Sequence, residues 1–338
     1  RALDVVSREV TGLMAAVNLD AGADTIAKGQ TIYSPVAPVN TTGNITPAMT
    51  VTAASDQTIG TKSLVVDSFK SSGFNWTGEE EFGLNSGARL ERIMQDQISQ
   101  CFRVHVNEIE AALCLAASVG ASRAIGTTAG TAPILADFAG AQKILTDNGA
   151  PMTDRHVVID TTAGVALRGT SNLYKVNEAG DGSLLRQGTL GSLYGFDIRE
   201  SAGIVSTAKG TAASATTNNA GYAVGATTLT LAAVGTGTIV AGDIITFAGD
   251  TNKYVVATGN ADVSAGGTIV LAAPGLRVAM SAATKAITVF GTSARNLALT
   301  RNAITLATRL PKFQQGDAAA DRAVITDPKT GISFELTM

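Results

Sequence analysis

Residues 88–118 carry the longest helical pattern in the sequence, and a helix of that length limits the folds open to the chain. Apolar side chains recur there every three or four residues, with no proline or glycine between them. They are Leu90, Ile93, Met94, Ile98, Cys101, Phe102, Val106, Ile109, Leu113 and Ala116. Such a helix is about 45 Å long, at least twice the usual length, and typically braces a broad subunit. A core helix of a large α/β domain explains the periodicity equally well.

A sharp change of composition sets residues 208–290 apart from the rest of the chain. Only seven charged residues occur there, and short β-prone runs alternate with Gly, Asp and Asn turns. The runs are 220–224, 227–231, 244–247, 253–257, 268–271 and 286–289. Six short strands in one segment predict a small closed all-β module. Because body-like patterns resume after it, we expect the module to be an insertion that folds independently.

The first 87 residues predict an arm followed by an extended loop. Apolar residues at helical spacing indicate a short amphipathic helix over 1–18, within an N-terminal arm of residues 1–20. Residues 21–61 are rich in Thr, Pro and Gly, and 62–76 return as strand material. A loop this long and this poor in large apolar residues cannot bury itself, so we expect contacts with another subunit to order it. Asn85 or Ser86 is the candidate cap of the long helix.

Residues 121–207 and 291–338 predict an α+β body on either side of the module. A helix is expected at 137–146, closed by Asn148 and Gly149, then a strand at 155–159 and a short helix from about Ala163. Residues 190–201 complete this part of the body. A third helix is expected over 294–310, and a hairpin over 325–336 turns around residues 327–331. With the long helix at 88–120, these segments give an α+β fold in five parts.

Composition and motifs argue against most site chemistry. With 25 basic and 28 acidic residues the chain lacks the positive charge of a dedicated nucleic-acid binder. No apolar run approaches the length of a membrane span, and no basic segment followed by an apolar core opens the chain, so we expect a soluble protein without an export signal. Neither a phosphate-binding loop nor a nucleophile elbow is present. We therefore expect no enzyme activity and no cofactor.

Histidines and cysteines are too few and too scattered for a metal site. The sequence has His105, His156, Cys101 and Cys114, with no metal-binding spacing among them. Both cysteines fall in the long helix, about 20 Å apart, so they are expected to be reduced and packed. The histidines are expected to be structural, and no metal or catalytic residue is predicted.

The acidic run Glu79, Glu80 and Glu81 is the candidate contact site. Three adjacent carboxylates repel one another, and placed before the long helix they gain little from its dipole, which acts within the first turn. Basic residues of an adjacent subunit would relieve the repulsion, so an intersubunit contact is predicted. Simple solvation of the three side chains is the alternative.

The order of these parts resembles the major capsid proteins of tailed bacteriophages, in the branch that carries an inserted β-rich domain. The similarity lies in the glycine-spaced segment 188–201, GTLGSLYGFDIRES, and in residues 296–309 and 325–335 of the C-terminal body. These motifs cover about a fifth of the chain, whereas the order of elements covers nearly all of it. The resemblance implies a Hong Kong 97-like fold with an N-terminal arm, an extended loop, a long spine helix and an inserted all-β domain.

This resemblance implies a subunit that self-assembles into pentamers and hexamers of an icosahedral shell and encloses double-stranded DNA. It also implies scaffolding and portal proteins as partners, non-specific contact with packaged DNA on the inner face, no membrane, and assembly in the host cytoplasm into a virion. Two other functions remain open from the residues alone. One is a bacterial surface or adhesin-like binding protein, suggested by the Thr-, Ala- and Gly-rich module; the other is an enzyme with an unrecognised site.

Overall fold

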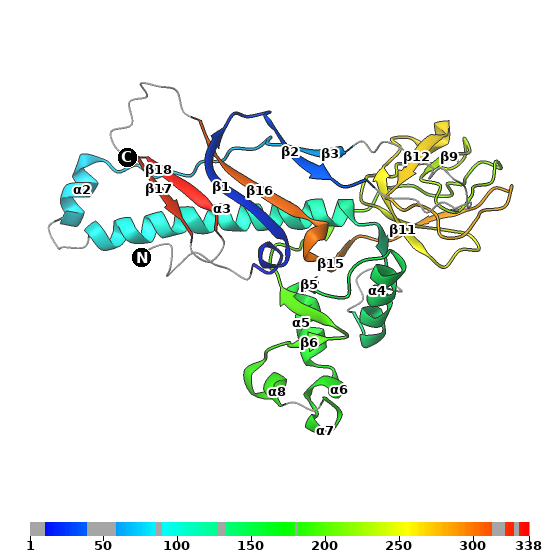
Figure 1. Ribbon diagram of the computed structural model, residues 1–338, viewed down its shortest axis with the longest axis horizontal. Helices are drawn as coiled ribbons and strands as arrows, with labels where there is room; N and C mark the ends of the chain where they lie inside the picture. The colour runs from blue at the N-terminus through cyan, green and yellow to red at the C-terminus, as the bar shows by residue number, and fades with distance from the viewer. Residues whose placement is uncertain are drawn as a thin grey trace, which may run out of the picture. The chain divides into compact units, whose positions relative to one another are not determined.

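The computed structural model describes residues 11–38, 59–85, 90–126, 133–179, 182–312, 322–327 and 331–337. Within these ranges the fold is α+β, as expected (Figure 1). The chain forms two compact units: Arg1–Asn18 with Phe74–Leu306, and Leu19–Gly73 with Ala307–Met338. The five-part division expected from the sequence is finer than this one and stays a prediction.

A single long helix, α3 (Leu90–Gly120, 31 residues), runs through the first unit (Figure 1). It confirms the helix expected from the apolar periodicity. The buried stripe of α3 includes Phe102, Val106, Leu113 and Cys114, so the apolar spacing does mark the packed face. A shorter helix, α2 (Gly78–Asn85), precedes it.

The body is built on a four-stranded sheet with the strand order β15-β5-β7-β6. The central strand β5 is buried along its whole length and runs parallel to β7. A core of Phe138, Ile159, Leu167 and Phe196 packs helices against this sheet. The elements are β5 (Arg155–Ile159), β6 (Ser192–Leu193), β7 (Phe196–Glu200), β15 (Leu297–Thr300), α4 (Leu135–Asp147), α5 (Thr161–Arg168), α6 (Ser171–Tyr174), α7 (Val176–Ala179) and α8 (Ser183–Gln187).

The end of α4 agrees with the sequence. Asn148 is its C-cap, and Gly149 follows with φ +79°, a conformation that glycine adopts without strain. The strand at 155–159 and the helix after it also lie where they were expected.

The helix expected over 294–310 is wrong. This segment forms β15 and β16 (Thr305–Pro311), joined by a 3-10 turn at Arg301–Ala303. Strand β15 pairs with β5 from Leu297↔Val158 to Thr300↔Arg155, and its burial alternates along the strand. Buried β5 has β7 on one edge and needs backbone partners on the other, and that requirement outweighs the helical preference of Leu and Ala.

The inserted segment is all-β, as expected, and its main sheet has the order β13-β10-β11-β12-β9. The strands are β9 (Thr228–Leu231), β10 (Ile244–Phe247), β11 (Lys253–Thr258), β12 (Gly267–Leu271) and β13 (Ile287–Val289). The strand expected at 220–224 is wrong: it is reduced to a single bridge between Tyr222 and Met280. Gly221 and Gly225, both with positive φ, turn the chain on either side of that bridge.

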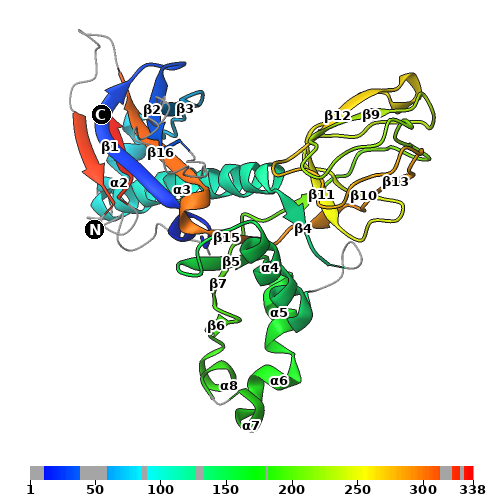
Figure 2. The same cartoon turned by 45° about the vertical axis from the view of Figure 1, so that its right-hand side comes forward.

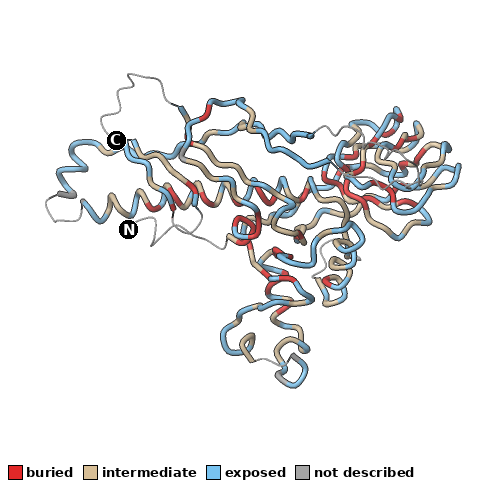
Figure 3. The backbone as a smooth tube through the Cα atoms, viewed as in Figure 1, coloured by how far each residue is buried: buried red, intermediate tan, exposed pale blue. Residues whose placement is uncertain are grey.

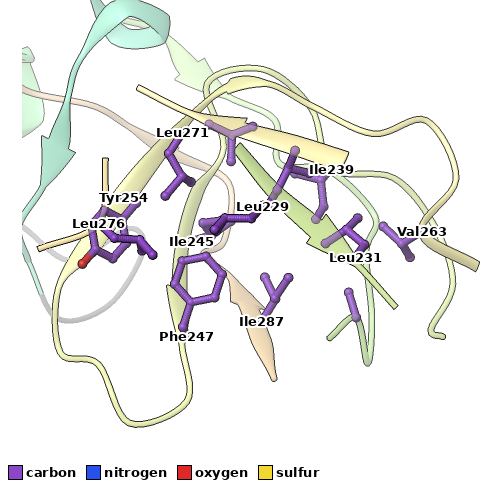
Figure 4. Packing of buried hydrophobic residues seen from close by; sticks show 13 residues of the cluster. Leu229, Leu231, Ile239, Ile245, Phe247, Tyr254, Val263, Leu271, Leu276 and Ile287 are labelled. Carbon is purple, nitrogen blue, oxygen red and sulfur yellow. The ribbon is translucent and has the colours of Figure 1, made fainter. Parts of the chain in front are cut away.

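One crossing segment closes the module. The amide of Asn218 donates to Thr230 O in β9, while the amide of Thr217 donates to Lys285 O just before β13. Both edges of the sheet therefore pair with the same few residues. Inside lies a continuous apolar core (Figure 4), made of Ala215, Leu229, Leu231, Ile239, Ile245, Phe247, Tyr254, Val256, Val263, Ile269, Leu271, Leu276 and Ile287. At its base the short strands β8 (Ser206–Thr207) and β14 (Ser293–Ala294) pair.

In its described residues the second unit consists of three two-stranded ladders: β1 with β16, β2 with β3, and β17 with β18. Their bounds are β1 (Asn18–Ile26), β2 (Thr31–Val36), β3 (Gly60–Val65), β17 (Arg322–Thr326) and β18 (Ser333–Thr337). The closing hairpin is confirmed by β17 and β18, whereas residues 328–330 of its turn lie outside the described residues. Residues 39–58 of the expected extended loop also lie outside them. Strand β3 covers only the start of the strand expected at 62–76.

The amphipathic helix expected over 1–18 is wrong where the structure describes it. Residues 1–10 lie outside the described residues, and the rest of the segment forms a 3-10 turn at Met14–Ala16 that leads into β1. The turn is short because Asn18 already pairs through its amide with Ile304 O. Asn85, expected to cap the long helix, is the last residue of α2 instead, and Ser86 is not among the described residues.

Candidate assembly surfaces

The β2–β3 hairpin is the most exposed regular structure in the second unit. All of β3 and four of the six residues of β2 are exposed (Figure 3). The register pairs Tyr33 with Ser63 and Ile32 with Leu64. Directly paired residues share a face, so Tyr33 lies on one face and Leu64 on the other.

Both faces of this hairpin present apolar side chains. Tyr33 is 68 % exposed and Val65 51 % on one face, and Leu64 is 42 % exposed and Val36 40 % on the other. A two-stranded hairpin by itself is marginally stable in water. Both faces of the hairpin therefore leave apolar side chains exposed to solvent.

The acidic run precedes the long helix, as expected, but it lies in the first turn of the separate helix α2, so it does sit at a helix N-terminus. The Thr77 amide donates to Glu80 Oε2 at 2.9 Å, and the Glu80 amide donates to Thr77 Oγ1 at 3.4 Å. This reciprocal pair is a capping box. The hydrogen bonds from Thr77 lower the pKa of the Glu80 carboxyl from its ordinary value. Glu80 therefore has a local role, and Glu79 and Glu81, both exposed, are left as candidates for an outside partner.

Aromatic rings lie close to this acidic run. Phe82 is 80 % exposed on α2 itself. Just before the helix the rings of Phe74 and Trp76 lie 5.4 Å apart, and Phe74 is 39 % exposed. Aromatic residues make up only 5 % of the chain, yet three of them lie close together in this stretch, with Phe74 and Phe82 exposed and Trp76 half-buried.

A buried carboxylate, which the sequence did not single out, holds the N-terminal segment on α3. Glu110 is 2 % exposed. Its Oε1 accepts the amides of Gly12 at 2.9 Å and Leu13 at 2.7 Å, and its Oε2 accepts the amide of Met14 at 2.9 Å. Ser201 Oγ donates to the same carboxylate at 2.6 Å. Four donors compensate the buried charge, which would otherwise be costly.

Close packing completes this site, which we call the Glu110 clasp: Glu110, Ser201 and the amides of residues 12–14. A Cβ atom on Gly12 would lie 2.4 Å from the carbonyl oxygen of Glu200, so only glycine fits there. Cys114 Sγ lies 3.8 Å from Ser201 Oγ, and burial raises the pKa of its thiol to about 11. That thiol is protonated at neutral pH and serves in packing. Both cysteines are free, as expected.

The structure does not bring the two histidines together. His105 lies on α3. His156 lies on β5 with a side chain 5 % exposed, its Nε2 3.5 Å from Asp154 Oδ1 and its Nδ1 3.4 Å from Asp197 Oδ2. Those carboxylates also pair with Arg301 and Arg199. His156 thus lies beside two carboxylate–guanidinium pairs on the sheet.

A cleft of about 700 Å³ lies between the end of α3, α4, β5 and β15. The charged residues of its described lining are Arg123, Asp137 and Arg295. Asp137 Oδ2 accepts the Ile134 amide at the start of α4. Arg123 donates to Asn252 and Arg295 to the carbonyl oxygen of Gly242. All three charges make structural bonds.

Among the described residues no group of three or more His, Cys, Asp or Glu side chains is arranged to hold a metal ion. None of the described helices is both long enough and apolar enough to cross a bilayer.

No family model matches the sequence, and no curated protein matches it. Solved structures do match. One from Mycobacterium phage Che8 is 17 % identical, covers 89 % of this chain and 92 % of its own, and gives a TM-score of 0.42. The capsid structure of the cyanophage P-SCSP1u is 14 % identical over 89 % and 90 % of the two chains, with a TM-score of 0.38.

The asymmetric unit of the mature capsid of bacteriophage PhiM1 is also 14 % identical, over 87 % of this chain and 86 % of that one, with a TM-score of 0.37. These structural neighbours come from phages. Two of the three are described as capsids.

Proposed function

We propose that the chain is the major structural subunit of an icosahedral phage capsid. The observation that carries the proposal is the β2–β3 hairpin, whose two faces both leave apolar side chains in solvent. A shell supplies the missing cover, because each subunit can place its hairpin on the next. Many modest, repeated contacts accumulate over a closed shell, so neither a cofactor nor a catalytic site is required.

In this proposal the subunits form pentamers and hexamers around packaged double-stranded DNA. Scaffolding and portal proteins are the other partners, assembly takes place in the host cytoplasm, and the product is a virion. A net charge of −3 suits an inner wall that touches DNA without gripping it.

Electron microscopy and sedimentation of the purified chain test the proposed function. Uniform closed particles, with or without co-expressed scaffolding protein, are the expected result. A monodisperse monomer or small oligomer under every assembly condition, including co-expression, would contradict a shell subunit and favour a surface-binding protein or an enzyme.

Proteolysis tests the role of the extended loop. We expect limited trypsin or thermolysin treatment of unassembled subunits to cut first within residues 21–61, and assembled shells to resist at the same sites, because only neighbours would cover the loop. Mass spectrometry of the fragments locates the cuts. Equal resistance in free subunits and shells would mean that the loop packs within its own chain.

Charge neutralisation tests the acidic run. Because Glu80 caps α2, the sharper variant is the pair Glu79→Gln and Glu81→Gln, which leaves the capping box intact. If basic residues of a neighbour face these carboxylates, the pair should weaken assembly with little change in subunit melting, and shells of the unchanged chain should loosen as salt rises. Glu91→Gln, on the first turn of α3, is the matched control. If the double variant assembles with normal yield and salt tolerance, the side chains of Glu79 and Glu81 are simply solvated and make no intersubunit contact.

The inserted segment gives a further prediction, since its core and its closing segment are both internal to it. Residues 208–290 expressed alone should give a β-type circular dichroism spectrum and a cooperative thermal transition. A coil-like spectrum without such a transition would show that the module depends on the body.

A further inference from the structure

The module receives one strand from outside its own segment. Strand β4 (Arg123–Ala124) comes after the last residue of α3, with only Ala121 and Ser122 between them. It pairs antiparallel with β11, Arg123 opposite Tyr254 and Ala124 opposite Lys253 (Figure 2).

Strand β4 covers the part of β11 that would otherwise be unpaired. On that edge β12 pairs only with the later residues of β11, at Val256 and Thr258. The opposite edge is taken by β10. The end of α3 therefore continues directly into the sheet of the module, and that junction is made of backbone hydrogen bonds.

Side chains reinforce this junction from the α3 side. The Arg123 guanidinium donates to Asn252 Oδ1. Asn252 is fixed in turn by Asp250, whose Oδ1 accepts its amide at 2.8 Å and its side-chain Nδ2 at 2.7 Å. Asp250 Oδ2 accepts the hydroxyl of Tyr254 at 2.6 Å, and Tyr254 is fully buried in the module core. A continuous chain of hydrogen bonds thus links Arg123 to the interior of the module.

A second point of attachment lies at Gly242. A Cβ atom there would lie 3.0 Å from Cγ2 of Val119 in the last turn of α3, so helix and module are in close contact. The Gly242 carbonyl oxygen accepts from the Arg295 guanidinium, and burial lowers the pKa of Arg295 from its ordinary value. Arg295 directly follows β14, where the chain returns from the module to the body.

If the two chain connections were its only attachment, the module could rotate about them relative to the body. It enters and leaves through β8 and β14, which pair over only two residues each. The additional contacts at β4 and Gly242 both originate at the C-terminal end of α3. We propose that α3, β4 and the inserted module form one rigid arm, with Arg123 and Arg295 as positioning residues, so that the module moves only together with the long helix.

The test measures a distance in the unassembled chain, so its outcome does not depend on whether the chain forms shells. Spin labels are attached at Val104→Cys on α3 and Val234→Cys on the module, both exposed positions. Cys101 and Cys114 are first replaced by Ala. Electron-electron double resonance then gives the distribution of distances between the labels.

A rigid arm should give one narrow distance distribution. Combining Ala124→Pro, Arg123→Ala and Arg295→Ala should lose that single peak and give a broad distribution, while Lys285→Ala, within the module, should leave it unchanged. Circular dichroism of each variant checks that the secondary structure is retained. If the variant with Ala124→Pro does not fold, the double variant Arg123→Ala with Arg295→Ala is measured in its place. A broad distribution in the parent chain, or a narrow one after both attachment points are removed, would overturn the proposal.

Discussion

Replacing Glu110 by alanine is expected to lower the free energy of unfolding by about 4 kcal/mol, one of the two largest effects predicted for this chain. The substitution leaves the amides of Gly12, Leu13 and Met14 without their acceptor in a buried site. Each unsatisfied buried amide costs about 1–3 kcal/mol, and partial hydration after local opening keeps the total below the sum.

Urea unfolding followed by circular dichroism measures this change. Glu110→Gln should recover only part of the loss, because an amide offers one acceptor oxygen and turns a donor toward other donors. Asp96→Asn, an exposed acid on the same helix, is the control and should shift stability by less than about 0.5 kcal/mol. If Glu110→Ala unfolds like Asp96→Asn, the clasp contributes nothing to holding the N-terminal segment.

The second large effect is expected from Gly237→Ala in the module. Gly237 has φ +87°, and a Cβ atom there would lie 2.4 Å from the carbonyl oxygen of Thr211. Two costs add: about 1 kcal/mol for placing a side chain in the left-handed region, and about 1–3 kcal/mol or more for forcing two backbone segments apart. We expect a loss of about 3–4 kcal/mol in the stability of the module.

Gly249→Ala separates these two costs. Gly249 has nearly the same φ, +88°, but has nothing within 4 Å of its Cβ position. It should therefore lose only about 1 kcal/mol. Thermal melting measures the loss of stability in each variant. Equal losses would mean that the contact with Thr211 relaxes without cost.

The acidic run shows how a local signal can be misread. Thr77 and Glu80 are three residues apart, which is the spacing of a capping box. This motif in the sequence could have predicted the start of α2. Apolar periodicity alone places the run before the long helix, since a short helix next to a long one adds little periodicity of its own. The consequence is physical: carboxylates in the first turn of a helix are stabilised by its dipole, so less of their repulsion remains to be relieved by a partner.

Glu110 shows a different limit. It lies between Val106 and Leu113 on the apolar stripe of α3, and an acid at one such position is the only trace that the sequence offers. Its partners are three backbone amides and the hydroxyl of Ser201, all distant in the sequence. Every residue except proline carries an amide, so no residue type marks the backbone donors of the clasp.

By itself the sequence determined the helices and strands that depend on interactions between residues close together in the chain. The length of α3, the ends of α4 and β5, and five of the module strands follow from apolar spacing, capping residues and turn glycines. Tertiary structure alone decided that 294–310 is strand, that β4 joins the module, and that Glu110 holds the N-terminal segment. In each of these cases the deciding interaction is a backbone hydrogen bond to a distant part of the chain. Backbone groups are nearly the same in every residue, so the partner of such a bond is chosen only when the chain has folded around it.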